Sequence, residues 1–150
     1  MMISLRRAEQ KDLPRIQALF AEMMRAIDPA SSGEGYAPED VAYYFSGGDD
    51  WICLAEEAGE AVAFLAMETH REDVNYIYLD DLSVSAAYRG NGIGTMLLNE
   101  AEKFARSMGI SFIVLHVKIT NPRAKALYER MGFAVLDDDG DRYRMLKTLA

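Results

Sequence analysis

The segment Arg89–Thr95 carries residue types that bind anions. Three glycines alternate with other residues just before a helix-like stretch. Glycine lets a backbone approach a ligand closely with its amide groups turned outward, and a following helix N-terminus adds free N–H groups and a partial positive charge. The segment also contains an arginine and no carboxylate. Its residues Arg89, Gly90, Asn91, Gly92, Ile93, Gly94 and Thr95 therefore predict an anion site, and pyrophosphate is the natural ligand.

Other glycine-rich phosphate loops differ from this one. A P-loop ends in Gly-Lys-Ser/Thr, whereas Gly94 is followed directly by Thr95. A dinucleotide-binding loop reads Gly-x-Gly-x-x-Gly after the first strand of a chain. This loop reads Gly-x-Gly-x-Gly and follows several strand-like stretches. A glycine-rich turn without a ligand is the remaining alternative.

Two further groups of polar residues stand at positions where they could belong to a site. Asp80 and Asp81 stand in the middle of the strand-like stretch Asn75–Val84, where apolar residues would be easier to bury. Successive strand side chains point to opposite faces, so only one of these carboxylates faces a given site unless a β-bulge intervenes. Asn121 and Tyr128 are two helical turns apart, which places them on the same side of a helix.

These residues resemble the two signatures of the GNAT superfamily of N-acetyltransferases. Arg89–Gly94 matches the pattern Arg/Gln-x-x-Gly-x-Gly/Ala, and Asn121–Phe133 matches the second signature, in the same order along the chain. The order of the predicted elements is similar to that of the family over essentially the whole chain. The resemblance implies an enzyme that uses acetyl-CoA as a cosubstrate and needs no metal.

By this resemblance, the end of a strand, the glycine loop and the Asn121 helix bind coenzyme A. The strand backbone is expected to hydrogen-bond the pantetheine arm, the loop amides to hold the pyrophosphate, and Asn121 to touch the arm from the other side. A basic side chain of the helix is expected to meet the 3′-phosphate, although a solvated helix face explains those charges equally well. The implied residues are Leu82, Ser83 and Val84, the loop residues named above, Asn121, Arg123, Lys125 and Tyr128, with Arg130 as a further candidate for the phosphate.

The resemblance also implies catalytic roles. Acetyl transfer to an amine needs a deprotonated amine, a polarised carbonyl and a proton for the departing thiolate. Tyr128 is the implied proton donor, and core packing is its alternative role. Relatives that acetylate polyamines and aminoglycosides carry an acid at the position of Asp80, which we expect to be the base, acting through a water molecule. Asp81 is the alternative base, and either carboxylate can instead only anchor the ammonium group. Cys53 has no histidine or acid beside it, so we expect direct attack in a ternary complex.

The expected acceptor is a small cationic amine, similar to a polyamine or an aminoglycoside. In the family, acceptor specificity comes from the first two helices, their loop and the final hairpin. Here those regions interleave acids with tyrosines, a pattern that a solvated surface also explains, and Tyr36 and Asp80 are the expected acceptor-binding residues. Acetylation of a peptide N-terminus or a protein lysine stays open, as does a non-catalytic module that binds or senses acyl-CoA. The residues of these regions are Glu34, Tyr36, Glu39, Asp40, Tyr43, Tyr44 and the run Asp137–Asp141.

Composition narrows the class of protein further. The formal net charge of −8 argues against sequence-independent binding of nucleic acid, which needs a basic surface. Cys53 is the only cysteine, and His70 and His116 lack metal-binding spacing, so no metal site is expected. No apolar run reaches the ~18 residues that span a membrane, and the N-terminus becomes charged too early for a signal peptide. We therefore expect a cytoplasmic protein without a membrane partner, and the resemblance is compatible with a homodimer.

Periodicity indicates the elements that must position these residues. Leu13, Ile16, Phe20, Met23 and Ile27 are three or four apart and predict an amphipathic helix. The whole chain, 1–150, is expected to form a single α/β domain, with a central mixed sheet of six to seven strands and helices on both faces. The predicted strands are Met2–Arg7, Trp51–Glu57, Glu60–His70, Asn75–Val84, Phe112–Val117, Ala134–Leu136 and Arg142–Leu146, and the predicted helices are Lys11–Ile27, Pro38–Phe45, Gly92–Met108 and Pro122–Met131.

Overall fold

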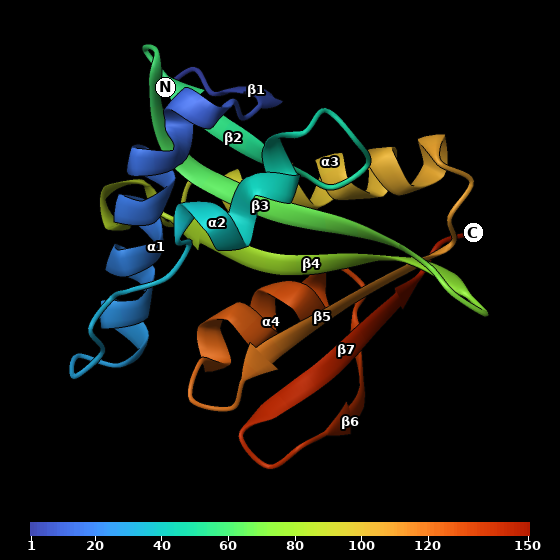
Figure 1. The fold of residues 1–150 in the computed structure, drawn as a ribbon. Coiled ribbons are helices and arrows are strands. Elements are labelled where there is room, and N and C mark those ends of the chain that lie inside the picture. Colours follow the sequence, from blue (N-terminus) through green and yellow to red (C-terminus); the bar gives the residue numbers. More distant parts are fainter.

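The computed structural model describes residues 1–150 and contains one seven-stranded sheet in the order β1-β2-β3-β4-β5-β7-β6 (Figure 1). Neighbouring strands are antiparallel except for β4 and β5, which are parallel. The mixed α/β sheet predicted from the sequence is confirmed. The strands are β1 (Ser4–Arg7), β2 (Trp51–Glu57), β3 (Glu60–Arg71), β4 (Asn75–Val84), β5 (Phe112–Lys118), β6 (Ala134–Asp138) and β7 (Arg142–Thr148).

Helices cover both faces of the sheet (Figure 1). On one face lie α1 (Leu13–Ile27) and α2 (Pro38–Val41), and on the other lie α3 (Ile93–Ser107) and α4 (Pro122–Arg130). The helix predicted over Pro38–Phe45 is α2 followed by a 3-10 segment. The 3-10 segments span Gln10–Asp12, Ala42–Phe45 and Ala86–Tyr88.

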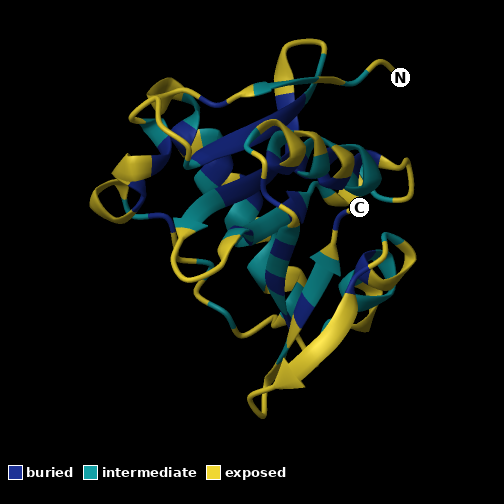
Figure 2. Cartoon of the chain, turned by 90° about the vertical axis from the view of Figure 1, so that its right-hand side faces the viewer, coloured by how far each residue is buried: buried dark blue, intermediate teal, exposed yellow.

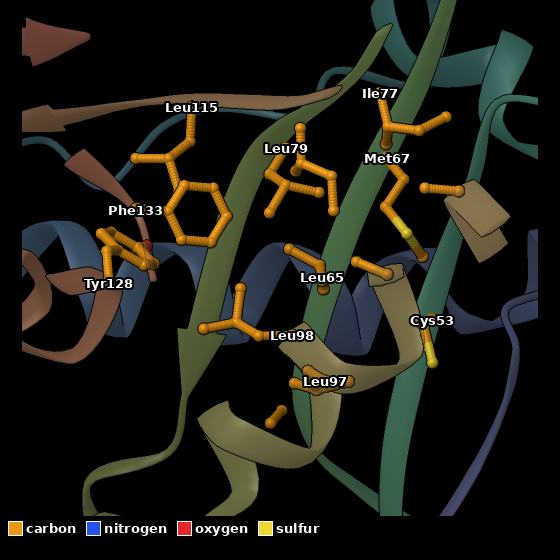
Figure 3. Close-up of a cluster of buried hydrophobic side chains, with 14 of the residues drawn as sticks. Cys53, Leu65, Met67, Ile77, Leu79, Leu97, Leu98, Leu115, Tyr128 and Phe133 are labelled. Atoms are coloured by element: carbon orange, nitrogen blue, oxygen red, sulfur yellow. The ribbon is translucent and has the colours of Figure 1, made fainter. Parts of the chain in front are cut away.

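Two hydrophobic layers form because strand side chains alternate between the faces of the sheet. On the α3 side, Leu65 and Ile77 belong to the same buried cluster as Leu97 (Figure 3). On the α1 side, Phe64 clusters with Ile16. The helices are thus held by the alternate residues of the central strands, which makes those strands a rigid base for the residues at their ends.

Three features bear on the chemistry expected from composition. Cys53 lies in the layer on the α3 side, and burial raises the pKa of its thiol to about 12, which makes it a poor nucleophile. No three His, Cys, Asp or Glu side chains gather closely enough to hold a metal ion. No helix has the length and apolar character needed to cross a membrane.

The sheet splits in its middle. β4 and β5 form only three residue pairs, in which Ile77, Tyr78 and Leu79 of β4 lie beside the range 113–115 of β5. Beyond Leu79, β4 stays paired with β3 up to Val84, while β5 stays paired with β7. The glycine loop follows β4 and the Asn121 helix follows β5. Both sequence signatures therefore meet at this split.

A β-bulge interrupts β4 where the split begins. Between two regular pairs, β3 contributes one residue, Ala66, and β4 contributes two, Asp80 and Asp81. The extra residue shifts the alternation of β4, so Leu79 and Leu82 both pack toward the α3 side. The rule that neighbouring strand residues face opposite sides therefore does not apply to the two aspartates.

The strand β6 forms an exposed edge of the sheet. All of its residues are exposed (Figure 2). Arginines of β7 pair with the acidic run that begins in β6: Arg144 lies 2.6 Å from Asp137 and Arg142 lies 3.1 Å from Asp139. The run Asp137–Asp141 is thus part of a solvated hairpin.

Candidate active site

A cavity of about 460 Å³ opens in the split between β4 and β5. Its walls carry three arginines, Arg89, Arg123 and Arg130, and no aspartate or glutamate. Walls of this charge favour a polyanion such as a nucleotide bearing several phosphates. Most of the residues predicted to bind a coenzyme line this cavity, namely Leu82, Val84, Arg89, Gly90, Gly92, Ile93, Gly94, Thr95, Asn121, Arg123 and Tyr128.

The glycine loop presents backbone amides to the cavity. Gly90 and Gly92 have φ angles of 79° and 78°, a left-handed conformation that favours glycine. No side chain caps the N-terminus of α3, so the N–H groups of its first turn are free to bind a ligand. Arg89 Nε donates to the carbonyl oxygen of Val84 at 3.3 Å, which holds the base of the loop against the end of β4. The loop therefore has the geometry of an anion site.

Three of the predicted coenzyme residues do not line the cavity. Ser83 points to the opposite face of the sheet, where its hydroxyl donates to Met23 Sδ at 3.1 Å. Asn91 uses its side-chain amide within the loop, donating to the carbonyl oxygen of Tyr88 at 3.0 Å. Lys125 pairs with Glu129 at 3.4 Å and covers the ring of a tyrosine in β7. For Ser83 and Asn91, the backbone is the part available to a ligand.

The other wall of the cavity is formed by α4. Asn121 is its N-cap residue, and its side-chain oxygen accepts a hydrogen bond from the N–H of Ala124 at 3.4 Å. Tyr128 is 8% exposed and packs edge-on against Phe133, with the ring centroids 6.0 Å apart (Figure 3). Its hydroxyl makes no hydrogen bond within the chain and is not fully buried. Tyr128 thus combines a packed ring with a free hydroxyl at the cavity.

The bulge places both aspartates beside tyrosines from the other face. Tyr36 donates its hydroxyl to Asp81 Oδ2 at 2.7 Å, and Tyr44 donates its hydroxyl to Asp80 Oδ2 at 3.0 Å. Neither carboxylate lines the cavity itself. The charge on Asp81 nevertheless acts on Tyr128, whose pKa is raised first by burial and then by that carboxylate. The acidic pair therefore lies between the cavity and the α1–α2 side.

Burial makes this pair hard to ionise twice. It raises the pKa of Asp80, against the lowering effect of the hydrogen bond from Tyr44. Burial, and then the charge of Asp80, raise the pKa of Asp81 to about 8. The two carboxyl groups lie within hydrogen-bonding reach of each other. They therefore titrate as one unit, which keeps a proton to a higher pH than two separate exposed carboxyl groups would.

Several residues around the site were not predicted from the sequence to belong to it. Ala26 and Ile27, at the end of α1, line the cavity from the far face. Glu68 of β3 accepts a hydrogen bond from Tyr44 at 3.0 Å and from Tyr43 at 2.8 Å. Tyr44 and Tyr43 are 24 and 25 residues away from Glu68 in the sequence, so no local pattern indicates these contacts.

The fold and the cavity define a protein whose mixed sheet splits around a cavity suited to a phosphate-bearing ligand, with a tyrosine in its wall and a pair of carboxylates nearby. The model of the Acetyltransferase (GNAT) family matches residues 14–133. The chain belongs to this family and is an N-acetyltransferase.

Individual relatives agree with this assignment. The chain is 29% identical to "Putative phosphinothricin acetyltransferase YwnH" of Bacillus subtilis, with 94% of each chain covered. It is 32% identical to an uncharacterized N-acetyltransferase of Archaeoglobus fulgidus, over 84% of this chain and 89% of the relative. Among solved structures, the PaiA N-acetyltransferase from Thermoplasma acidophilum, in complex with coenzyme A, has the same fold, with a TM-score of 0.82, 22% identity and 99% of each chain covered.

Proposed function

We propose that the chain transfers the acetyl group of acetyl-CoA to the primary amine of a small cationic acceptor, by direct attack in a ternary complex. The observation that carries this proposal is the separation of charge across the split. The cavity side holds three arginines, while the α1–α2 side holds Glu68, Asp80 and Asp81. An anionic donor and a cationic acceptor thus each have a complementary side.

The donor is held by backbone and arginine. The free amides of the loop and α3 suit the pyrophosphate, and Arg123 and Arg130, which both line the cavity, are our candidates for the 3′-phosphate. The exposed backbone of β4 beyond the split is free to hydrogen-bond the pantetheine amides, because β5 no longer pairs with it. Asn121 approaches from the other wall.

For the acid–base roles we choose Asp80 as the base, with Asp81 as its alternative. Asp80 accepts the proton of the acceptor's ammonium group, through a water molecule. The neutral amine then attacks the thioester carbonyl, and the C–S bond breaks as the thiolate leaves. The nitrogen gives up its second proton at this stage, which balances the proton that the thiolate takes up from Tyr128. Tyr128 is our choice for the donation of a proton to that thiolate, because its hydroxyl lies at the cavity and has no competing partner within the protein.

A panel of amines tests the proposal. We expect thiol release from acetyl-CoA to be fastest with 1,4-diaminobutane, spermidine or an aminoglycoside. The panel should also include phosphinothricin and peptides with a free N-terminus or a lysine. Phosphinothricin is included because the name of the Bacillus subtilis relative contains it. Faster acetylation of the peptides would contradict the small-amine acceptor. Tight binding of acetyl-CoA without thiol release for any amine would contradict catalysis and favour a sensing module.

A further inference from the structure

A chain of side-chain hydrogen bonds runs from the β4 bulge to the protein surface. Tyr44 Oη lies 3.0 Å from Asp80 Oδ2 and 3.0 Å from Glu68 Oε2. Glu68 Oε1 lies 2.9 Å from His70 Nε2. The two contacts of Glu68 use different carboxylate oxygens, so the carboxylate connects Tyr44 to His70. No step of this chain needs a water molecule.

Exposure to solvent increases from Tyr44 through Glu68 to His70. Tyr44 is 1% exposed, and the side chains of Glu68 and His70 are 20% and 33% exposed. The inner end is enclosed by packed aromatic rings: Tyr44 packs against Tyr43, with the ring centroids 4.3 Å apart. The hydrogen bonds therefore link the half-buried carboxylate of Asp80, through the buried Tyr44, with an imidazole that reaches solvent.

His70 is held in a fixed orientation at the outer end. Its ring stacks on Tyr76 with an interplanar angle of 7°, and it meets Tyr78 edge-on. These contacts point Nε2 at Glu68 and leave Nδ1 on the side of Glu72. The distance from Nδ1 to Glu72 Oε1 is 3.9 Å, and the Glu72 side chain is largely exposed. The titratable groups that face His70 are Glu68 and Glu72, from β3 and the turn after it, and Tyr76 and Tyr78 from β4. Two further groups act through these neighbours: Tyr43 donates a hydrogen bond to Glu68, and the charge of Arg144 in β7 acts on Tyr76.

This series of hydrogen bonds is suited to carrying a proton from Asp80 to solvent. A carboxylate whose pKa is raised by burial accepts a proton readily and must lose it again in every turnover. Imidazole is the side chain that exchanges protons with water most easily near neutral pH. We infer that Tyr44, Glu68 and His70 relay to solvent the proton that Asp80 takes from the acceptor ammonium group. This inference rests on the proposed function.

Each transfer leaves the groups balanced. The N–H bond of the ammonium group breaks and its proton goes to Asp80. Asp80 passes a proton to Tyr44 Oη while the proton already on Tyr44 moves to Glu68 Oε2. The Glu68 carboxyl group turns and delivers that proton to His70 Nε2, and the imidazole releases its Nδ1 proton to water. Asp80, Tyr44 and Glu68 are then in their starting states, and exchange with water restores the histidine tautomer.

Chemical rescue tests the relay. His70→Ala should lower kcat about tenfold below pH 8, with KM for acetyl-CoA unchanged, when assayed with 1,4-diaminobutane or the fastest amine of the panel. Added imidazole should restore most of the lost rate, because it replaces the missing base at the open end. His116→Ala is the matched control: it hydrogen-bonds Tyr78 at 2.7 Å and lies off the chain. That variant should keep its rate and show no response to imidazole.

Tyr44→Phe locates the break. It keeps the ring but removes the hydroxyl that joins Asp80 to Glu68, so kcat should fall and imidazole should not restore it. Wild-type rate in both His70→Ala and Tyr44→Phe would overturn the relay, as would equal rescue of the two. Asp80→Asn separates the two proposals: if it keeps full activity, Asp80 is not the base and the relay is overturned with it. An inactive Asp80→Asn beside an unaffected His70→Ala overturns the relay alone.

Discussion

A β-carbon added to Gly94 would lie 3.0 Å from Leu127 Cδ2, so the Leu127 side chain of α4 lies close against the backbone of α3 and would have to shift for any larger residue at position 94. The backbone of Gly94 has an ordinary φ angle, which means that space is the reason for the glycine. Both residues line the cavity. The contact therefore lies in the wall of the cavity, where a shift of Leu127 would change the space for a ligand.

Gly94→Ala should weaken coenzyme A binding about tenfold, or ~1.4 kcal/mol, because the new methyl group pushes Leu127 into the cavity. Calorimetric titration with coenzyme A measures this. Gly109→Ala is the control, since Gly109 has a φ of 70° and no atom near its β-carbon position. It should lower the melting temperature through backbone strain and leave the affinity unchanged. Equal affinities of Gly94→Ala and the wild type would contradict the steric role.

Tyr128→Phe should lower kcat roughly 100-fold, the usual contribution of a general acid. The melting temperature should hardly change, because the hydroxyl has no partner within the chain to lose. Steady-state kinetics and thermal unfolding check the two statements. Tyr143→Phe is the matched control, since Tyr143 lies under Lys125, outside the cavity. An unchanged kcat in Tyr128→Phe would show that solvent protonates the thiolate.

Arg123→Ala should weaken binding of coenzyme A about tenfold while leaving 3′-dephospho-coenzyme A unaffected, because a hydrogen-bonded arginine–phosphate pair is worth ~1.5–3 kcal/mol and solvent at the exposed Arg123 reduces that contribution. Lys125→Ala removes a positive charge two residues away that does not line the cavity. It should bind both ligands as the wild type does. Parallel titrations of the two ligands give the comparison. Equal losses for both ligands in Arg123→Ala would place the 3′-phosphate elsewhere, with Arg130 as the next candidate.

Asp81→Asn should stabilise the protein, and increasingly so as pH rises. Burial raises the pKa of Asp81 in the folded state above its unfolded value, so the folded protein binds more protons and loses stability between about pH 4 and pH 8. The amide removes this loss while keeping an acceptor for Tyr36 and a donor for Asp80. Because one unit of pKa is worth ~1.4 kcal/mol, we expect the gain to be larger at pH 8 than at pH 5 by up to ~4 kcal/mol. Urea unfolding at both pH values measures it, with exposed Asp73→Asn as the control.

Much of the cavity follows from local sequence patterns. Glycines at Gly90 and Gly92 permit the left-handed turns of the loop, and seven-residue spacing brings Asn121 and Tyr128 to one wall. The same periodicity separates Arg123 from Lys125 by about 200° around the helix, which agrees with only Arg123 lining the cavity.

The acidic side of the site could not be predicted in the same way. Strand alternation places Asp80 and Asp81 on opposite faces, and the bulge that reverses this depends on how β3 pairs with β4. The partners of these carboxylates come from distant segments: Tyr36 is 45 residues from Asp81, and Tyr44 is 36 residues from Asp80. Such contacts arise from tertiary packing and leave no periodic signal.

The short ladder between β4 and β5 has a consequence for cooperativity. Three residue pairs join the four-stranded half of the sheet, β1 to β4, to the three-stranded half that contains β5. A coenzyme that hydrogen-bonds the free edge of β4 and touches α4 supplies the missing connection. In the free protein, amides of β5 and β7 should therefore exchange with deuterium earlier than those of β2 and β3. With the coenzyme bound, both halves should exchange together, as a single cooperative unit.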